Sequence, residues 1–107
     1  MKIVYTDEAT KEINDAVDYL IGKSAPPSIV DDLQSDVNAA EDLLLQFPRS
    51  SPPAGHGMRK CLLNKFAYQL IYSVEGDVIR VYAFAHLSRR PNYWRSRVSS
   101  SRTKTPK

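Results

Sequence analysis

Residues 85–97, with the sequence AHLSRRPNYWRSR, gather residue types that could cleave RNA. Attack by a 2′-hydroxyl needs a base for its proton, an acid for the leaving oxygen and cations that stabilise the phosphorane-like transition state. Histidine, tyrosine and arginine side chains suit these roles. The candidates for this chemistry are Arg59, Arg80, His86, Arg89, Arg90 and Tyr93. We expect neither metal nor cofactor, because the sequence contains no metal-ligand cluster, phosphate-binding Gly-rich loop or Ser-His-Asp pattern.

The two parts of the chain carry opposite charge. Residues 1–47 contain three Lys/Arg and ten Asp/Glu, a net charge of −7, whereas residues 48–107 contain twelve Lys/Arg and two acids, a net charge of +10. One explanation is that acidic helices lie beside a basic sheet. So large a positive charge in the second part nevertheless favours a polyanionic or acidic partner, such as nucleic acid or an acidic protein segment.

Length and composition indicate one cytoplasmic domain. The chain of 107 residues, 42% of them hydrophobic, is long enough for one core. No apolar run is as long as a membrane span, and the first residues lack the apolar region of a signal peptide. The single cysteine, Cys61, cannot form an internal disulfide and is expected to be a buried core residue.

The first half of the chain predicts a strand and a helical hairpin. Residues 2–6 are typical of a short strand, and Thr6 is placed to cap a helix that ends at Gly22. Residues 24–28 predict a turn, with Pro27 as the first residue of a second helix. An apolar stripe of this helix is predicted to be core: Val30, Leu33, Val37, Ala40, Leu44 and Phe47. Its acidic residues are expected on a solvated face: Asp31, Asp32, Asp36, Glu41 and Asp42.

The second half predicts a three-stranded meander. After a loop at 47–57 that is rich in Pro, Gly and Ser, we expect strands at 58–63, 67–74 and 77–87, with a tight turn at 75–77.

The order of these elements, β-α-α-β-β-β, predicts an α+β fold. A helical hairpin packs on one face of a largely antiparallel, twisted sheet, and a short basic C-terminal segment follows. We expect the first strand to pair at an edge of the meander. Residues 1–98 form the predicted single domain. Residues 99–107 contain no apolar residue and are predicted to be a disordered basic tail.

Alternation along the last predicted strand sorts its side chains onto two faces. One face is apolar and is expected to pack against the helices: Ile79, Val81, Ala83, Ala85 and Leu87. The other is aromatic and cationic and is expected to meet a partner: Val78, Arg80, Tyr82, Phe84 and His86. If Arg59 and Arg80 project from the same face of the sheet, they form a cationic patch. The alternative is that they pair with the acidic helices.

Several of these residues have simpler structural explanations. His86 suits an ordinary strand end as well as a functional role. His56 lies in a Gly-flanked loop and is interpreted as incidental. Tyr93 and Trp94 could anchor the C-terminal segment to the core, and for Trp94 this is the preferred interpretation.

The chain resembles the RelE/ParE superfamily, the toxins of bacterial type II toxin–antitoxin modules, over residues 2–97. The resemblance depends on FP at 47–48, then GMRKCLL, then YQLIYSVEGDVIRVYAFAH, then RRPNYWRSR. It implies the α+β fold described above and a cognate antitoxin, a small protein with an acidic or partly disordered segment. It also implies assembly as a homodimer or as a hetero-oligomer with that antitoxin.

The superfamily has two branches with different targets. RelE-like members cleave mRNA on the ribosome, and by position Arg59, Arg80, His86 and Tyr93 could serve that reaction. ParE-like members act on DNA gyrase and are not nucleases. The helical hairpin and the AHLSRRPNYW ending are more similar to the ParE-like branch, which implies a gyrase-directed toxin of the plasmid-stabilisation type. An inactive member that only binds a protein partner is the third alternative.

The resemblance also suggests which residues contact the target or the antitoxin. They are Arg59, Arg80, Tyr82, His86, Arg89, Arg90, Tyr93, Trp94 and Arg95.

Overall fold

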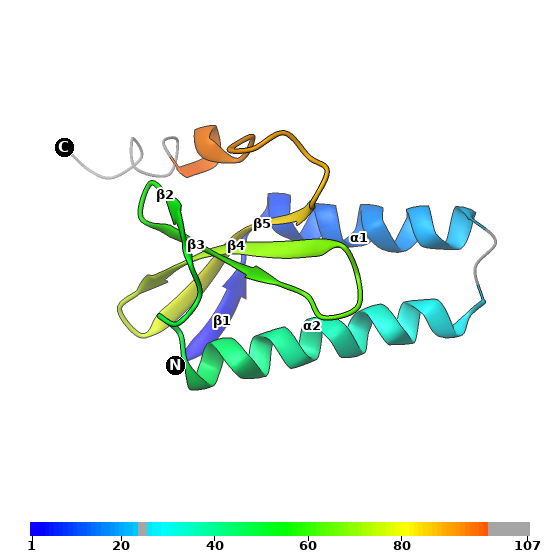
Figure 1. Ribbon diagram of the computed structural model, residues 1–107, viewed down its shortest axis with the longest axis horizontal. Helices are drawn as coiled ribbons and strands as arrows, with labels where there is room; N and C mark the ends of the chain where they lie inside the picture. The colour runs from blue at the N-terminus through cyan, green and yellow to red at the C-terminus, as the bar shows by residue number, and fades with distance from the viewer. Residues whose placement is uncertain (24–25, 99–107) are drawn as a thin grey trace.

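The computed structural model describes residues 1–23 and 26–98, which form a helical hairpin and one five-stranded sheet (Figure 1). The elements in chain order are β1 (Lys2–Tyr5), α1 (Asp7–Gly22), α2 (Ser28–Gln46), β2 (Pro53–Gly55), β3 (Met58–Leu62), β4 (Tyr68–Glu75) and β5 (Val78–His86). The strands lie in the order β1-β5-β4-β3-β2, and only the β1–β5 pair is parallel. The predicted α+β fold is confirmed, with β1 at a sheet edge as expected.

Local sequence explains where the helices begin and what they cover. The Thr6 hydroxyl accepts a hydrogen bond from the backbone N–H of Ala9 at 3.1 Å, so the predicted cap of α1 is confirmed. Apolar side chains of α1 and α2 pack on one face of the sheet. We call this cluster the helix-side core: Ala9, Ala16, Leu33, Val37, Ala40, Leu44, Cys61, Leu63, Leu70, Tyr72, Ile79, Val81 and Phe84.

Two residues of α2 and Phe47, which follows it, differ from the sequence prediction. Asp36 is buried, with 5% of its surface exposed, and Glu41 accepts a hydrogen bond from the Tyr5 hydroxyl, so neither belongs to a solvated face. Phe47 is 55% exposed and does not belong to the core stripe. The reason is that the hairpin also contacts the sheet and the loops along its sides, which helical periodicity alone does not reveal.

Part of the predicted loop at 47–57 is the short edge strand β2. It joins β3 through a tight turn in which Gly55, His56 and Gly57 all have positive φ, 89°, 57° and 76°. The two glycines adopt this backbone conformation without steric cost, whereas the same conformation is strained at His56. The His56 ring meets the Trp94 ring edge-on, with centroids 6.1 Å apart, so the turn contacts a residue that follows the last strand.

β5 contains a β-bulge. Ile71 pairs with Ala83, but the next residue of β4, Tyr72, pairs with Val81, which leaves Tyr82 as an extra residue. A bulge breaks the alternation of a strand, because two consecutive side chains of the bulged strand lie on nearly the same side.

The bulge corrects the predicted faces of this strand. Beyond it, Phe84 joins the helix-side core, whereas Tyr82 and Ala83 pack together on the opposite face. Leu87 is 47% exposed and does not pack into the core. The expected partner-facing surface of five alternating side chains therefore does not form, since Phe84 and His86 lie on the helix side.

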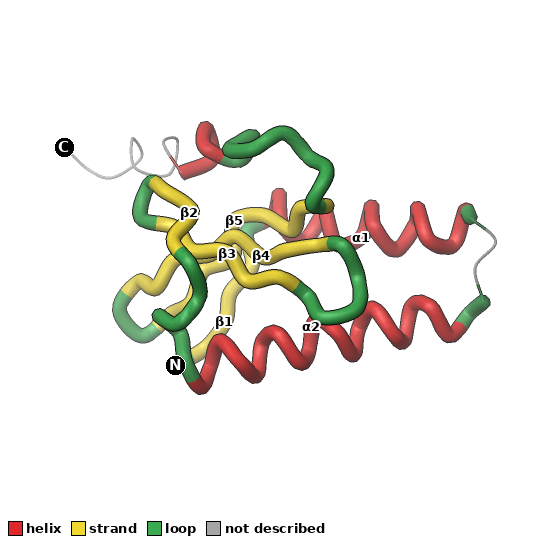
Figure 2. The backbone as a smooth tube through the Cα atoms, in the orientation of Figure 1, coloured by secondary structure: helices red, strands yellow, loops and turns green. Residues whose placement is uncertain are grey.

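The chain after β5 turns back over the face of the sheet opposite the helix-side core and forms a helical turn at 95–98 (Figure 2). We call residues 87–98 the C-terminal segment. Trp94, 4% exposed, and Val98, 6% exposed, fill a second cluster, which confirms Trp94 as an anchor. This C-terminal core comprises Met58, Ile71, Tyr82, Ala83, Trp94 and Val98. The predicted tail at 99–107 and part of the predicted turn at 24–28 lie outside the described residues.

Candidate functional site

Glu12 of α1 is the centre of the polar contacts that hold the C-terminal segment. Its carboxylate accepts a hydrogen bond from the Tyr93 hydroxyl at 2.7 Å and two from the Arg97 guanidinium at 2.9 and 3.0 Å. The backbone N–H of Phe84 donates a fourth at 3.0 Å. Arg97 also donates to the carbonyl oxygen of Tyr82 at 3.0 Å. One carboxylate thus joins α1, β5 and the C-terminal segment.

The electrostatics of this cluster favour the ionised carboxylate. Burial alone would raise the pKa of Glu12, but hydrogen bonds from Arg97, Tyr93 and the Phe84 amide hold it below its ordinary value. Burial and the donation to Glu12 raise the pKa of Tyr93. The Tyr93 hydroxyl therefore stays protonated and is committed to a structural hydrogen bond.

Three arginines of the C-terminal segment are exposed, and we refer to them together as the basic surface: Arg89, Arg90 and Arg95. The Arg89 guanidinium lies 3.8 Å from the centre of the Tyr93 ring, a cation–π contact, and 3.9 Å from the Glu12 carboxylate. Arg90 and Arg95 extend from the turns on either side of Tyr93. The basic surface is thus linked to the Glu12 cluster through the chain and through Arg89.

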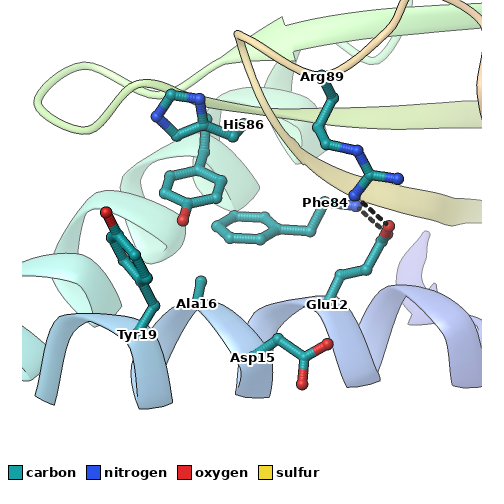
Figure 3. A pocket seen from close by; sticks show the side chains of 8 residues that line it. Glu12, Asp15, Ala16, Tyr19, Phe84, His86 and Arg89 are labelled. Carbon is teal, nitrogen blue, oxygen red and sulfur yellow. Dashed lines mark hydrogen bonds and ion pairs between the residues drawn. The ribbon is translucent and has the colours of Figure 1, made fainter. Parts of the chain in front are cut away.

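A pocket of about 160 Å³ opens beside this cluster, between α1 and the end of β5 (Figure 3). It is lined by Glu12, Asp15, Ala16, Tyr19, Tyr68, Phe84, His86 and Arg89. The His86 Nδ1 accepts a hydrogen bond from the backbone N–H of Ser88 at 3.1 Å. The Ser88 hydroxyl lies 2.8 Å from the same nitrogen. The pocket therefore combines aromatic walls with an imidazole and a guanidinium.

Arg80 belongs to a separate cluster around Glu75. Its Nε lies 2.9 Å from one carboxylate oxygen of Glu75, and the Tyr82 hydroxyl donates to the other at 2.7 Å. The Ser73 hydroxyl donates to that second oxygen as well. Burial would raise the pKa of Glu75, but hydrogen bonds from Ser73, Tyr82 and Arg80 lower it. Arg80 thus has a carboxylate partner on its own hairpin.

The cationic patch of Arg59 and Arg80 does not form. Arg59 pairs with Tyr72 and Arg80 with Ser73, and consecutive residues of a strand point to opposite faces. Arg59 lies on the helix side and donates to the carbonyl oxygen of Ser51 at 2.8 Å. The four residues proposed for RNA cleavage, which also include His86 and Tyr93, are therefore divided among separate contacts.

Sequence reasoning did not identify Glu12. The signal was present, because Glu12 lies three residues after Ala9 and four before Ala16, on the helical face that carries the core. A carboxylate at such a position needs donors. Its partners follow 72, 81 and 85 residues later, and helical spacing could not identify them.

Two further predictions concern Cys61 and metal binding. Cys61 is buried with 4% of its surface exposed, as expected, and burial raises the pKa of its thiol.

Within residues 1–23 and 26–98, no group of three or more His, Cys, Asp or Glu side chains is arranged to hold a metal ion. In the same part of the chain, no helix is both long and apolar enough to cross a membrane.

Two of the three comparisons with known proteins found a match. The family model of the ParE toxin of the type II toxin–antitoxin system parDE matches residues 3–91. A solved structure titled "Chromosomal ParDE TA system from P. aeruginosa" is similar to this chain with a TM-score of 0.69 and 18% identity, covering 80% of this chain and 95% of that one. At this identity the likeness concerns the fold. The curated protein sequences contain no match.

Proposed function

Because the chain belongs to the ParE toxin family of type II toxin–antitoxin systems, we propose that it arrests growth by acting on DNA gyrase in the cytoplasm. We propose also that a cognate antitoxin with an acidic segment neutralises it. The basic surface is the proposed contact for the target or the antitoxin. Its positive charge complements an acidic partner, and cations of this kind steer association and set specificity.

The observation that carries the gyrase proposal is that Arg59 and Arg80 lie apart from each other and belong to other contacts than His86, Arg89 and Tyr93. A nuclease must bring its base, its acid and its phosphate-binding cations to one reacting phosphate. Arg59 and Arg80 point to opposite faces of the sheet, and the Tyr93 hydroxyl donates to Glu12. A toxin that acts by binding a protein needs no such convergence.

A supercoiling assay tests the target. Purified protein is added to DNA gyrase with relaxed plasmid and, in parallel, to ribosomes stalled on mRNA. We expect inhibition of supercoiling and intact mRNA. Codon-register cuts in the mRNA with unaffected gyrase would replace this proposal with a ribosome-dependent nuclease. No effect in either assay, with antitoxin binding retained, would indicate an inactive member.

Charge reversal on the basic surface tests the contact. Arg90→Glu with Arg95→Glu is preferable to any change of Arg89, because Arg89 also touches Glu12 and Tyr93. We expect the double variant to lose toxicity, since the removal of a few central residues abolishes most of the binding energy of an interface. The matched control carries the same charge change at exposed positions outside the C-terminal segment, Arg49→Glu with Lys60→Glu. An equal loss in the control would show that net charge matters and the surface does not.

Co-expression with the product of the neighbouring reading frame tests the antitoxin. We expect the two proteins to purify together at low salt and the complex to weaken as salt screens the basic surface. Two proteins that stay separate at low salt would contradict the proposed partner.

A further inference from the structure

The C-terminal segment is held by two different means. Trp94 and Val98 are buried in the C-terminal core, and Tyr93 and Arg97 hydrogen-bond to Glu12. The apolar contacts fix where the segment lies against the sheet. Since hydrogen bonds are directional, the contacts to Glu12 fix how the turn between His86 and Val98 is oriented.

The geometry allows Glu12 to control more than one side chain at once. Its carboxylate is only 13% exposed, so the guanidinium that it binds, 19% exposed, depends on it for charge compensation. Arg89 stacks on the Tyr93 ring whose hydroxyl donates to the same carboxylate. Loss of the negative charge would leave Arg97 half buried without its counter-ion and free the Tyr93 ring on which Arg89 lies.

We propose that Glu12 is a positioning residue that holds the basic surface in the arrangement its partner binds. This inference rests on the proposed function, because the basic surface is taken to contact the target or the antitoxin. Glu12 itself need not touch either protein. Preorganisation of this kind raises affinity, since the loop does not lose conformational freedom on binding.

The simplest alternative is that Trp94 and Val98 alone hold the segment. In that case the contacts to Glu12 satisfy buried polar groups and have no influence on the arginines. The two explanations differ in what happens when the charge of Glu12 is removed and the apolar contacts remain.

The variant that separates them is Glu12→Gln in the full chain. Glutamine keeps the size of the side chain but lacks the negative charge, and its amide cannot accept two hydrogen bonds from Arg97 and one from Tyr93. The matched control is Asp18→Asn, which removes an exposed carboxylate from the same helix. Hydrogen exchange of the amides at residues 87–98 reports the order of the segment. Growth arrest and gyrase inhibition report its effect.

We expect Glu12→Gln to remain folded, with the protection of β3, β4 and β5 unchanged. The amides of the C-terminal segment should exchange at least about tenfold faster, the loss expected for charge-assisted hydrogen bonds. The concentration needed for inhibition should rise by a similar factor. Asp18→Asn should match the natural chain in every measurement.

Two outcomes would overturn the inference. Unchanged exchange in the C-terminal segment of Glu12→Gln would show that the apolar contacts suffice. Faster exchange with unaltered inhibition would show that Glu12 orders the segment without any effect on binding.

Two further outcomes of the experiment also have a defined interpretation. If Glu12→Gln does not fold, Tyr93→Phe replaces it as the test, because it removes a single donor to Glu12. Amide exchange in the C-terminal segment and the inhibitory concentration should then rise by smaller factors. No change in Tyr93→Phe would overturn the inference. If the natural chain is not toxic, the proposed function fails. Exchange then decides alone whether Glu12 holds the segment.

Discussion

Asp36 on α2 and Glu12 on α1 both fix a distant part of the chain, but they bind different kinds of donor. Asp36 accepts hydrogen bonds from three backbone amides of the β3–β4 loop: Asn64 at 3.1 Å, Lys65 at 2.8 Å and Phe66 at 2.9 Å. Three of the four hydrogen bonds to Glu12 come from side chains of the C-terminal segment.

This difference in donors separates a contact that serves the fold from one that can serve function. Every non-proline residue has a backbone amide, so the loop at 64–66 needs only Asp36 to be held. The C-terminal segment needs Tyr93 and Arg97 as well, and each can be changed without altering the backbone. We interpret the Asp36 contact as part of the folding core and the Glu12 contact as an adjustable link to a binding surface.

The largest expected effect comes from breaking the Asp36 contact. Asp36→Ala removes the acceptor of three amides, and we expect the free energy of unfolding to fall by about 3 kcal/mol, because hydrogen bonds to charged groups contribute roughly 1.5–3 kcal/mol each and water replaces part of the loss at the exposed loop. Urea unfolding measures it. The control Asp32→Ala, at an exposed position of the same helix, should change little. A loss below about 1 kcal/mol for Asp36→Ala would contradict this interpretation.

A smaller effect is expected from Trp94→Ala. Removing a buried tryptophan costs about 3–5 kcal/mol in a core that cannot relax. Here we expect about 2 kcal/mol, since the C-terminal segment can detach and thereby limit the cost. Leu44→Ala, in the helix-side core between α2 and the sheet, cannot be relieved in this way. Urea unfolding should rank Leu44→Ala as the more destabilising change, and the reverse order would show that the segment belongs to the folding core.

The same contrast explains how much of the molecule the sequence predicts. The Thr6 cap, the two helices and the four predicted strands follow from neighbours within a few residues, and these predictions are confirmed. The bulge at Tyr82 and the opposite faces of Arg59 and Arg80 depend on pairing between strands, which local patterns do not specify.

The polar contacts are still harder to predict. Asp36 looks like one of several solvent-facing acids of α2, and only the fold brings it to the loop 28–30 residues later. The sequence predicts that the basic C-terminal segment is the richest stretch for function, and this stays a prediction. The hydrogen bonds that hold the segment are made with Glu12, which precedes Tyr93 by 81 residues. Whether that stretch binds gyrase stays a prediction.

Acid should weaken the contacts of both Asp36 and Glu12. The loss should be smaller than when the side chain is removed, since a protonated carboxyl group keeps one acceptor oxygen. Burial would raise the pKa of Asp36 and of Glu12, but their donors hold both below the ordinary values of 3.8 and 4.5. The stabilisation from each carboxylate is complete above its ordinary pKa, which applies to the unfolded chain. It is lost as the pH falls through the lower pKa of the folded chain. We expect the free energy of unfolding to decrease below pH 4.5, and less steeply in Glu12→Gln. Equal slopes in the two chains would contradict the role of Glu12.

The smallest effect is expected at His86, which takes part in neither contact. His86 is exposed, its ring hydrogen-bonds to Ser88, and it meets the Tyr68 ring edge-on with centroids 5.1 Å apart. His86→Ala should change the free energy of unfolding by no more than about 0.5 kcal/mol, as is usual at the surface. Because the basic surface is held by Glu12, growth arrest should also persist. If His86 were instead a catalytic base, its loss would slow mRNA cleavage by about 10²–10⁴-fold and remove toxicity while stability stayed the same. Growth arrest by His86→Ala, measured beside the unfolding curve, therefore distinguishes a binding toxin from a nuclease in a variant that leaves both contacts intact.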